Sequence, residues 1–160
     1  MATFMYTILC KENTKEKNML KTGLVHPEIL NALAGAGHTG KVVIADGDYP
    51  VATTAGVNAE IVHLNLMPGS VTATDTLKAL LSVMVIEDAE VMDVPEGRDE
   101  PEIWNEFRSI IKEYHPEVEM KKLERFAFYD KVKQDDVALV IQTGETRDYA
   151  CLILTIGSLW

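Results

Sequence analysis

The sequence contains only two cysteines, Cys10 and Cys151, and no run of apolar residues that approaches a membrane span. Two widely separated cysteines cannot form a disulfide framework, which fits a reducing compartment. A spanning helix needs about 20 consecutive apolar residues. No segment has the basic-then-apolar order of a signal peptide either. We therefore expect a soluble, cytoplasmic protein.

Positive charge is also scarce, because 15 basic side chains stand against 25 acidic ones and the formal net charge is −10. Such a surface repels phosphate backbones and anionic lipids, so we expect neither nucleic acid nor a membrane as partner. The 160 residues are 47% hydrophobic. That content is enough to bury the core of one domain.

The motifs of several common catalytic sites are missing as well. The sequence has no phosphate-binding G-x-x-x-x-G-K-[ST] or G-x-G-x-x-G pattern and no G-x-S-x-G nucleophile elbow. Its four histidines lack the spacing of a zinc site, so we expect no metal. Cys151 lies in an apolar run without the partners that a nucleophile needs. Acids, bases and hydroxyl groups remain, a set suited to proton transfer on a neutral polar ligand.

Short apolar runs alternate with helical patterns, which predicts an α/β fold with three α/β/α layers and a mixed, mostly parallel central sheet. Because no helix joins the last two strands, we expect at least one antiparallel edge strand. Residues 19–160 are expected to form a single domain. Residues 1–18 are expected to be a disordered extension or a start-site artefact. We expect strands at 41–45, 60–66, 86–94, 120–123, 137–142 and 151–156 and a loop at 53–56. Helices are expected at 27–35, at 101–114 and at 125–134, and a further helix, capped by Thr74 or Asp75, is expected to include Leu77 to Met84.

Two polar segments are candidate sites. Asp46 follows the strand 41–45, and residues just beyond the carboxyl ends of strands line the ligand crevice of open α/β sheets. His38 lies at the other end of that strand, so a single subunit need not bring it close to Asp46. The polar connection 143–149 is the second candidate. Each also has an ordinary structural interpretation, since His38 could complement a helix dipole and Asp46-Gly47 could form a simple turn.

Several short motifs in register carry a resemblance to a known family. The chain resembles the D-ribose pyranase and L-fucose mutarotase family from about residue 19 to its end, and the segment 125–129 is more similar to the fucose branch. The motifs, in chain order, are Leu20-Lys21, His26-Pro27-Glu28-Ile29-Leu30, Gly37-His38, Ala45-Asp46, Tyr49-Pro50, Glu124-Arg125-Phe126-Ala127-Phe128-Tyr129, Thr143-Gly144-Glu145 and Tyr149.

The resemblance implies a small cytoplasmic isomerase that interconverts the cyclic forms of a free monosaccharide, such as L-fucose or a related aldose. It also implies that no cofactor is needed and that identical subunits assemble, often into a ring-shaped decamer. His38 then matches the general acid, and Tyr129, or a water that it holds, is the expected complement. The residues expected to bind the sugar are Asp46, Arg125, Glu145, Tyr149 and Cys151.

Two departures from the family pattern bear on this expectation. Cys151 stands where family members commonly have asparagine, and Asp48 adds a second carboxylate after Asp46. Either could change which sugar binds or abolish turnover. Three other functions therefore stay open: a non-catalytic sugar-binding protein that accompanies sugar uptake, a purely structural oligomer, and an aldose–ketose isomerase.

Overall fold

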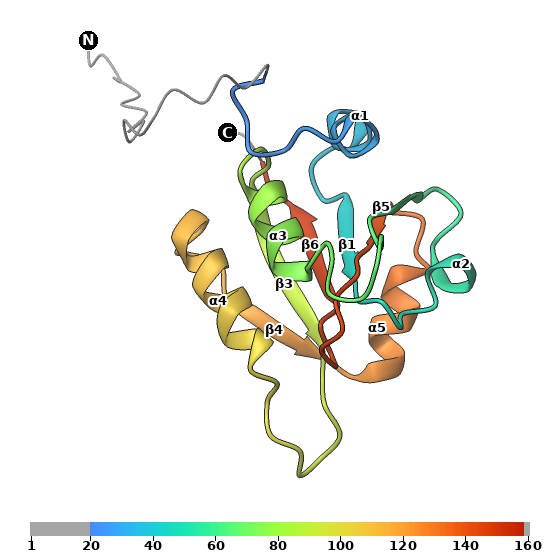
Figure 1. The fold of residues 1–160 in the computed structure, drawn as a ribbon, viewed down its shortest axis with the longest axis vertical. Helices are drawn as coiled ribbons and strands as arrows, with labels where there is room; N and C mark the ends of the chain where they lie inside the picture. Colours follow the sequence, from blue (N-terminus) through green and yellow to red (C-terminus); the bar gives the residue numbers. More distant parts are fainter. Residues whose placement is uncertain (1–19, 159–160) are drawn as a thin grey trace.

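The structure, a computed structural model, describes residues 20–158, in which a six-stranded sheet lies between two layers of helices (Figure 1). The expected extension, 1–18, lies outside the described residues. The strands are β1 (Lys41–Ala45), β2 (Glu60–His63), β3 (Ile86–Met92), β4 (Met120–Leu123), β5 (Val137–Gln142) and β6 (Leu152–Ile156). The helices are α1 (Pro27–Gly35), α2 (Val51–Thr54), α3 (Ala73–Leu81), α4 (Ile103–Tyr114) and α5 (Arg125–Val132).

The strand order is β2-β5-β1-β6-β3-β4, and only β6 runs against the others. The mixed, mostly parallel sheet is therefore confirmed. The expected antiparallel edge is wrong, because β6 lies in the middle and pairs with β1 on one side and β3 on the other (Figure 1). The connection after β5 does not form a hairpin, since β1 lies between β5 and β6. The start of β6 thus meets the carboxyl ends of the other strands.

Strand β1 separates the two apolar cores, and all five of its residues are buried. Successive side chains of a strand point to opposite faces of the sheet. Val42 and Ile44 accordingly pack in the core that includes residues of α1, α3 and α4. Val43 and Ala45 pack in the other core with residues of α2 and α5. The expected three-layer architecture is confirmed.

Three local differences from the expected elements have simple causes. The predicted loop at 53–56 contains part of α2, a helix of four residues that is too short for a periodic signature. The predicted strand 60–66 ends at His63. Thr72 caps helix α3, not Thr74 or Asp75 as predicted, because the Thr72 hydroxyl accepts a hydrogen bond from the Asp75 N–H at 3.1 Å. A side-chain oxygen that satisfies a free helical N–H stabilises that start.

Helix α4 presents a wide apolar face to the core. Ile103, Trp104 and Phe107 are almost fully buried, and the Trp104 Nε1 donates a hydrogen bond to the backbone oxygen of Tyr149 at 2.9 Å. None of the helices in residues 20–158 is long and apolar enough to cross a membrane.

We expect Trp104→Ala to lower the free energy of unfolding by about 3–5 kcal/mol, because it leaves a large cavity. Urea denaturation measures this loss. The exposed Lys112→Ala on the same helix is the matched control and should change stability by less than about 0.5 kcal/mol. A Trp104→Ala variant as stable as the control would contradict the packing described here.

Candidate functional site

A polar pocket of about 280 Å³ lies at the edge of the sheet where β1, β3, β4 and β5 end and β6 begins. Asp46 follows β1 directly, Cys151 precedes β6, and Tyr129 lies on α5. Because β6 is antiparallel, its first residues reach the same edge as Asp46. The structure thus brings together every predicted site residue except His38: Asp46, Arg125, Tyr129, Glu145, Tyr149 and Cys151.

The carboxylate of Asp46 is held by the turn that follows it. Its Oδ1 accepts hydrogen bonds from the backbone N–H groups of Asp48 at 3.2 Å and Tyr49 at 2.9 Å. Burial raises the pKa of Asp46, and repulsion from the nearby Asp48 adds to this effect, although the hydrogen bonds oppose it. A carboxyl group with a raised pKa accepts a proton more readily than one with an ordinary pKa.

Cys151 supports the Asp46 turn from the neighbouring strand. Its side chain is buried, and its sulfur accepts a hydrogen bond from the backbone N–H of Asp46 at 3.4 Å. Burial raises the pKa of the Cys151 thiol well above its ordinary value, so the thiol stays protonated. A protonated thiol is a poor nucleophile. Its role in binding sugar stays a prediction.

An aromatic stack fixes Tyr129. Its ring lies parallel to that of Tyr49, with centroids 5.2 Å apart and an angle of 12° between the planes. Tyr49 in turn meets Phe128 edge-on at 6.2 Å. Burial raises the pKa of Tyr49, which keeps it neutral. Tyr49 was given no role from its motif, but its ring stacks on that of Tyr129, the predicted partner in proton transfer.

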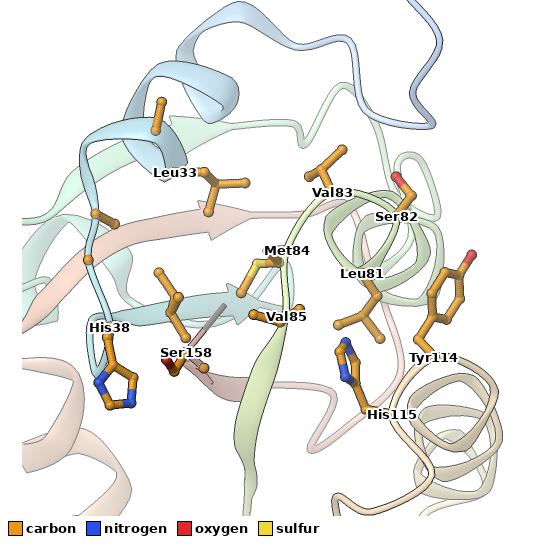
Figure 2. A pocket seen from close by; sticks show the side chains of 15 residues that line it. Leu33, His38, Leu81, Ser82, Val83, Met84, Val85, Tyr114, His115 and Ser158 are labelled. Carbon is orange, nitrogen blue, oxygen red and sulfur yellow. The ribbon is translucent and has the colours of Figure 1, made fainter. Parts of the chain in front are cut away.

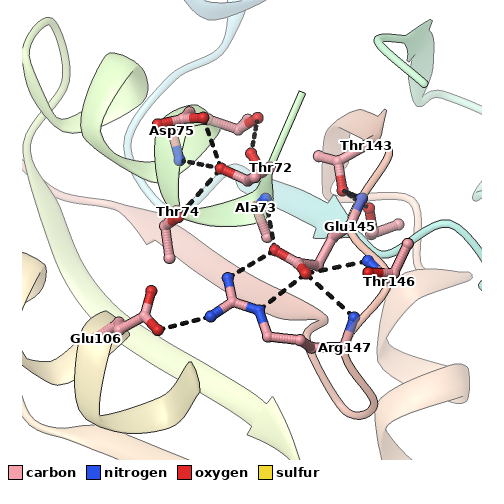
Figure 3. A network of polar contacts seen from close by, with 11 residues as sticks. Thr72, Ala73, Thr74, Asp75, Glu106, Thr143, Glu145, Thr146 and Arg147 are labelled. Atoms are coloured by element: carbon pink, nitrogen blue, oxygen red, sulfur yellow. Dashed lines mark hydrogen bonds and ion pairs between the residues drawn. The ribbon is translucent and has the colours of Figure 1, made fainter. Parts of the chain in front are cut away.

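Glu145 is the centre of a polar network (Figure 3). Arg147 donates to it through Nε and Nη2, both at 2.9 Å. The Glu145 carboxylate also accepts from the backbone N–H groups of Thr146 at 3.0 Å, Arg147 at 3.1 Å and Ala73 at 3.3 Å. Hydrogen bonding to Arg147 lowers the pKa of Glu145 to about 2. These bonds engage the Glu145 carboxylate within its own loop and with α3. Its contact with sugar stays a prediction.

Tyr149 is held on both sides. Its backbone is in the left-handed region, with φ 54°, and its carbonyl oxygen accepts from Trp104. The guanidinium of Arg98 lies 4.9 Å from the centre of its ring, a cation–π contact. Arg98 also donates to Asp148 at 2.9 Å. Arg98 was not predicted, because its partner Asp148 lies 50 residues away in the sequence. Arg147 lies within the predicted polar connection 143–149 but was given no role of its own.

His38 lies at the opposite edge of the sheet, before β1. It lines a separate hollow of about 610 Å³, where Figure 2 shows it on the opposite side from His115. Its Nε2 is 2.8 Å from Oε2 of Glu87. Since a five-residue strand spans about 17 Å, β1 keeps His38 and Asp46 of one subunit too far apart to share a ligand. Within residues 20–158, no cluster of three or more His, Cys, Asp or Glu side chains could hold a metal ion.

Comparison with known proteins decides the family. The sequence profile of the RbsD / FucU transport protein family matches residues 19–159. The chain belongs to this family. It is 33% identical to the fucose mutarotase of Danio rerio over 140 residues, which cover 82% of this chain and 87% of that protein. It is 29% identical to the D-ribose pyranase of Thermosipho africanus, over 89% of this chain and 100% of that protein.

Solved structures of the family share the fold. The fucose mutarotase of Streptococcus pneumoniae in complex with L-fucose aligns with a TM-score of 0.73 and 27% identity, over 85% of this chain and 95% of that chain. The RbsD of Bacillus subtilis complexed with D-ribose aligns with a TM-score of 0.71 and 28% identity, over 89% of this chain and 100% of that chain. Mutarotases and pyranases are isomerases, so the family and the enzyme class expected from the sequence are confirmed.

The ion pair of Glu145 predicts how stability depends on pH. A carboxyl group whose pKa is lowered by folding stabilises the folded state above its unfolded pKa, and this contribution is lost as the pH falls through the folded pKa. For Glu145 the window runs from 4.5 down to about 2. Glu145→Gln should therefore be less stable than the wild type at pH 7, and the difference should shrink toward pH 2.

Urea denaturation of both proteins between pH 7 and pH 2 measures this difference. The exposed Glu119→Gln serves as the control and should follow the wild type at every pH. A Glu145→Gln variant whose stability stays parallel to that of the wild type across this range would show that the ion pair does not stabilise the fold.

Proposed function

We propose that this protein is a monosaccharide mutarotase or pyranase, which interconverts the anomers or the pyranose and furanose forms of a free aldose such as L-fucose. The observation that carries the proposal is the polar pocket that gathers Asp46, Arg125, Tyr129 and Tyr149 at one edge of the sheet. At about 280 Å³ it is near the lower end of ligand pockets, roughly 300 Å³ and upward, which suits a small ligand. Relatives named for fucose and ribose act on sugars of this class.

The proposed chemistry is an exchange of protons on a hemiacetal. One group takes the proton of the anomeric hydroxyl as the bond between the anomeric carbon and the ring oxygen breaks. Another group donates a proton to that ring oxygen, which leaves an open-chain aldehyde. Rotation of the aldehyde and the reverse steps then close the ring on the other face. Each positioned acid or base contributes about 10²–10⁴ in rate.

His38 and Tyr129 are the groups that we propose for these two transfers. An imidazole both donates and accepts protons near neutral pH. The phenol of Tyr129, or a water that it holds, is its complement, while Asp46, Arg125 and Tyr149 orient the sugar hydroxyls. Glu145 and Cys151 support the loop and the turn that carry these contacts.

The position of His38 implies that a second subunit completes the site. Within one subunit β1 separates His38 from the pocket, so the imidazole that serves a given pocket must come from a neighbouring copy. A homo-oligomer, such as the expected decamer, provides such neighbours through repeated contacts between the same two surfaces. Assembly is then part of catalysis.

We expect His38→Ala to lower the rate of anomer exchange by about 10² or more, because it removes one acid or base. Saturation-transfer NMR of the anomeric protons, over a small panel of aldoses that includes L-fucose and D-ribose, measures the exchange. The matched control is His63→Ala, which lies on β2 and makes a hydrogen bond to Gln142 outside the pocket. It should exchange sugar as fast as the wild type.

The same spectra, together with a melting temperature, separate the alternative functions. Sugar binding without faster exchange would favour a non-catalytic binding protein, and the appearance of a ketose would favour an aldose–ketose isomerase. A melting temperature that no sugar changes would favour a purely structural oligomer. Unchanged exchange in His38→Ala would remove His38 from the mechanism.

A further inference from the structure

Residues 143–149, here called the site loop, form most of the connection between β5 and β6. They carry five of the twelve residues that line the pocket, Arg147 among them, but have no regular secondary structure. Something else must therefore fix its shape. Gly144 allows one close approach, since a Cβ at this position would lie 2.2 Å from the backbone oxygen of Ser70. Backbone hydrogen bonds hold the first residues of the loop, since Thr143 donates to Ala45 and Gly144 donates to Val71. Charged side chains add contacts from Glu145 to Asp148.

Arg147 connects three parts of the chain around the site loop (Figure 3). Its Nε and Nη2 donate to Glu145, and its Nη1 donates to Oε1 of Glu106 on α4 at 2.6 Å. Glu145 in turn accepts from the N–H of Ala73 at the start of α3. The loop is thus bound to α3 through the Glu145 carboxylate and to α4 through the Arg147 guanidinium group.

The carboxylates of Glu145 and Glu106 differ in burial, and we expect them to contribute differently to the fold and to the site. The side chain of Glu145 is only 3% exposed, and that of Glu106 is 48% exposed. A buried carboxylate without a partner is costly, so Glu145 requires Arg147 for folding. Glu106 lines none of the hollows described above and touches the site only through Arg147.

Helix α4 reaches the site loop at a second point, where Trp104 donates to the carbonyl oxygen of Tyr149. The Glu106–Arg147 pair and this bond hold both ends of the segment that places Tyr149 in the pocket. The proposed proton-transfer groups, His38 and Tyr129, lie on other elements. Movement of the loop would therefore change how well a sugar is held more than how fast protons move.

We infer that Arg147, anchored by Glu106 on α4, is a positioning residue that sets the affinity of the pocket for its sugar by fixing the site loop. The inference rests on the proposed function, because it concerns the same pocket. It assigns neither residue a part in proton transfer. Loss of an interaction made equally with substrate and transition state raises KM and leaves kcat unchanged.

Glu106→Gln is the decisive variant, because it weakens the bridge without altering the pocket lining. We expect KM to rise about two- to fivefold, the effect of losing one exposed ion pair, with kcat within about twofold of the wild type. Arg147→Met should raise KM by about tenfold or more, since charged hydrogen bonds are lost. It also changes the pocket lining, so Glu106→Gln is the variant that separates positioning from direct contact with sugar. The control is Glu113→Gln, which removes the same charge from an exposed position on α4 and should leave both constants unchanged.

The kinetic measurement is anomer exchange at increasing concentrations of L-fucose, or of D-ribose if the wild-type protein exchanges it faster. A Glu106→Gln variant that matches Glu113→Gln, or that loses kcat at constant KM, would overturn the inference. If Arg147→Met does not fold, Glu106→Gln decides the question alone, because the Glu106 side chain is about half exposed and its loss leaves no buried charge unpaired.

Amide hydrogen exchange tests the inference without sugar. The N–H groups of Thr146 and Arg147, both bonded to Glu145, should exchange about two- to fivefold faster in Glu106→Gln, while amides of β1 and β5 keep their protection. Unchanged exchange in the site loop would overturn the inference. If the wild-type protein exchanged no sugar, the proposed function would fail. Hydrogen exchange would still show whether Arg147 fixes the loop.

Discussion

Strand β1 imposes the constraint on which the rest of the site depends. It is buried along all five residues and pairs with β5 on one side and β6 on the other. A strand held in this way cannot shorten or bend, so the groups at its two ends stay apart by its full length. His38 at one end and Asp46 at the other therefore belong to different hollows of the same subunit. A reaction that uses both must draw them from two copies of the chain.

The direction of β6 determines which residues meet at the edge of the sheet that carries Asp46. Because β6 alone is antiparallel, the polar residues before it arrive where the parallel strands end. Asp46 and Cys151 thus come into contact although they lie 105 residues apart in sequence. The site loop has no regular secondary structure, and the ion pair between Glu145 and Arg147 helps to hold it in place (Figure 3). The pocket combines a rigid floor of strands and aromatic rings with a wall held by ion pairs.

Much of this could be predicted from the sequence, for reasons visible in particular residues. The bounds of β1, β4 and β5 were predicted correctly. Residues typical of turns flank β1 and β5, which are short apolar runs. Asp46 was predicted from its place just after a strand, and Tyr129 from a motif of the family. The central place of β6 was missed, since local patterns record burial and length but not which strands pair. The Arg147–Glu106 pair was missed for the same reason, because its members lie 41 residues apart.

The most direct test of the central claim is the mixing of two inactive variants, His38→Ala and Asp46→Asn, each defective at one end of β1. If each pocket takes its imidazole from a neighbouring subunit, refolding the two together should restore about a quarter of wild-type anomer exchange, because random assembly pairs intact His38 with intact Asp46 at that frequency. Mixed oligomers that form but exchange sugar no faster than either variant alone would contradict the account.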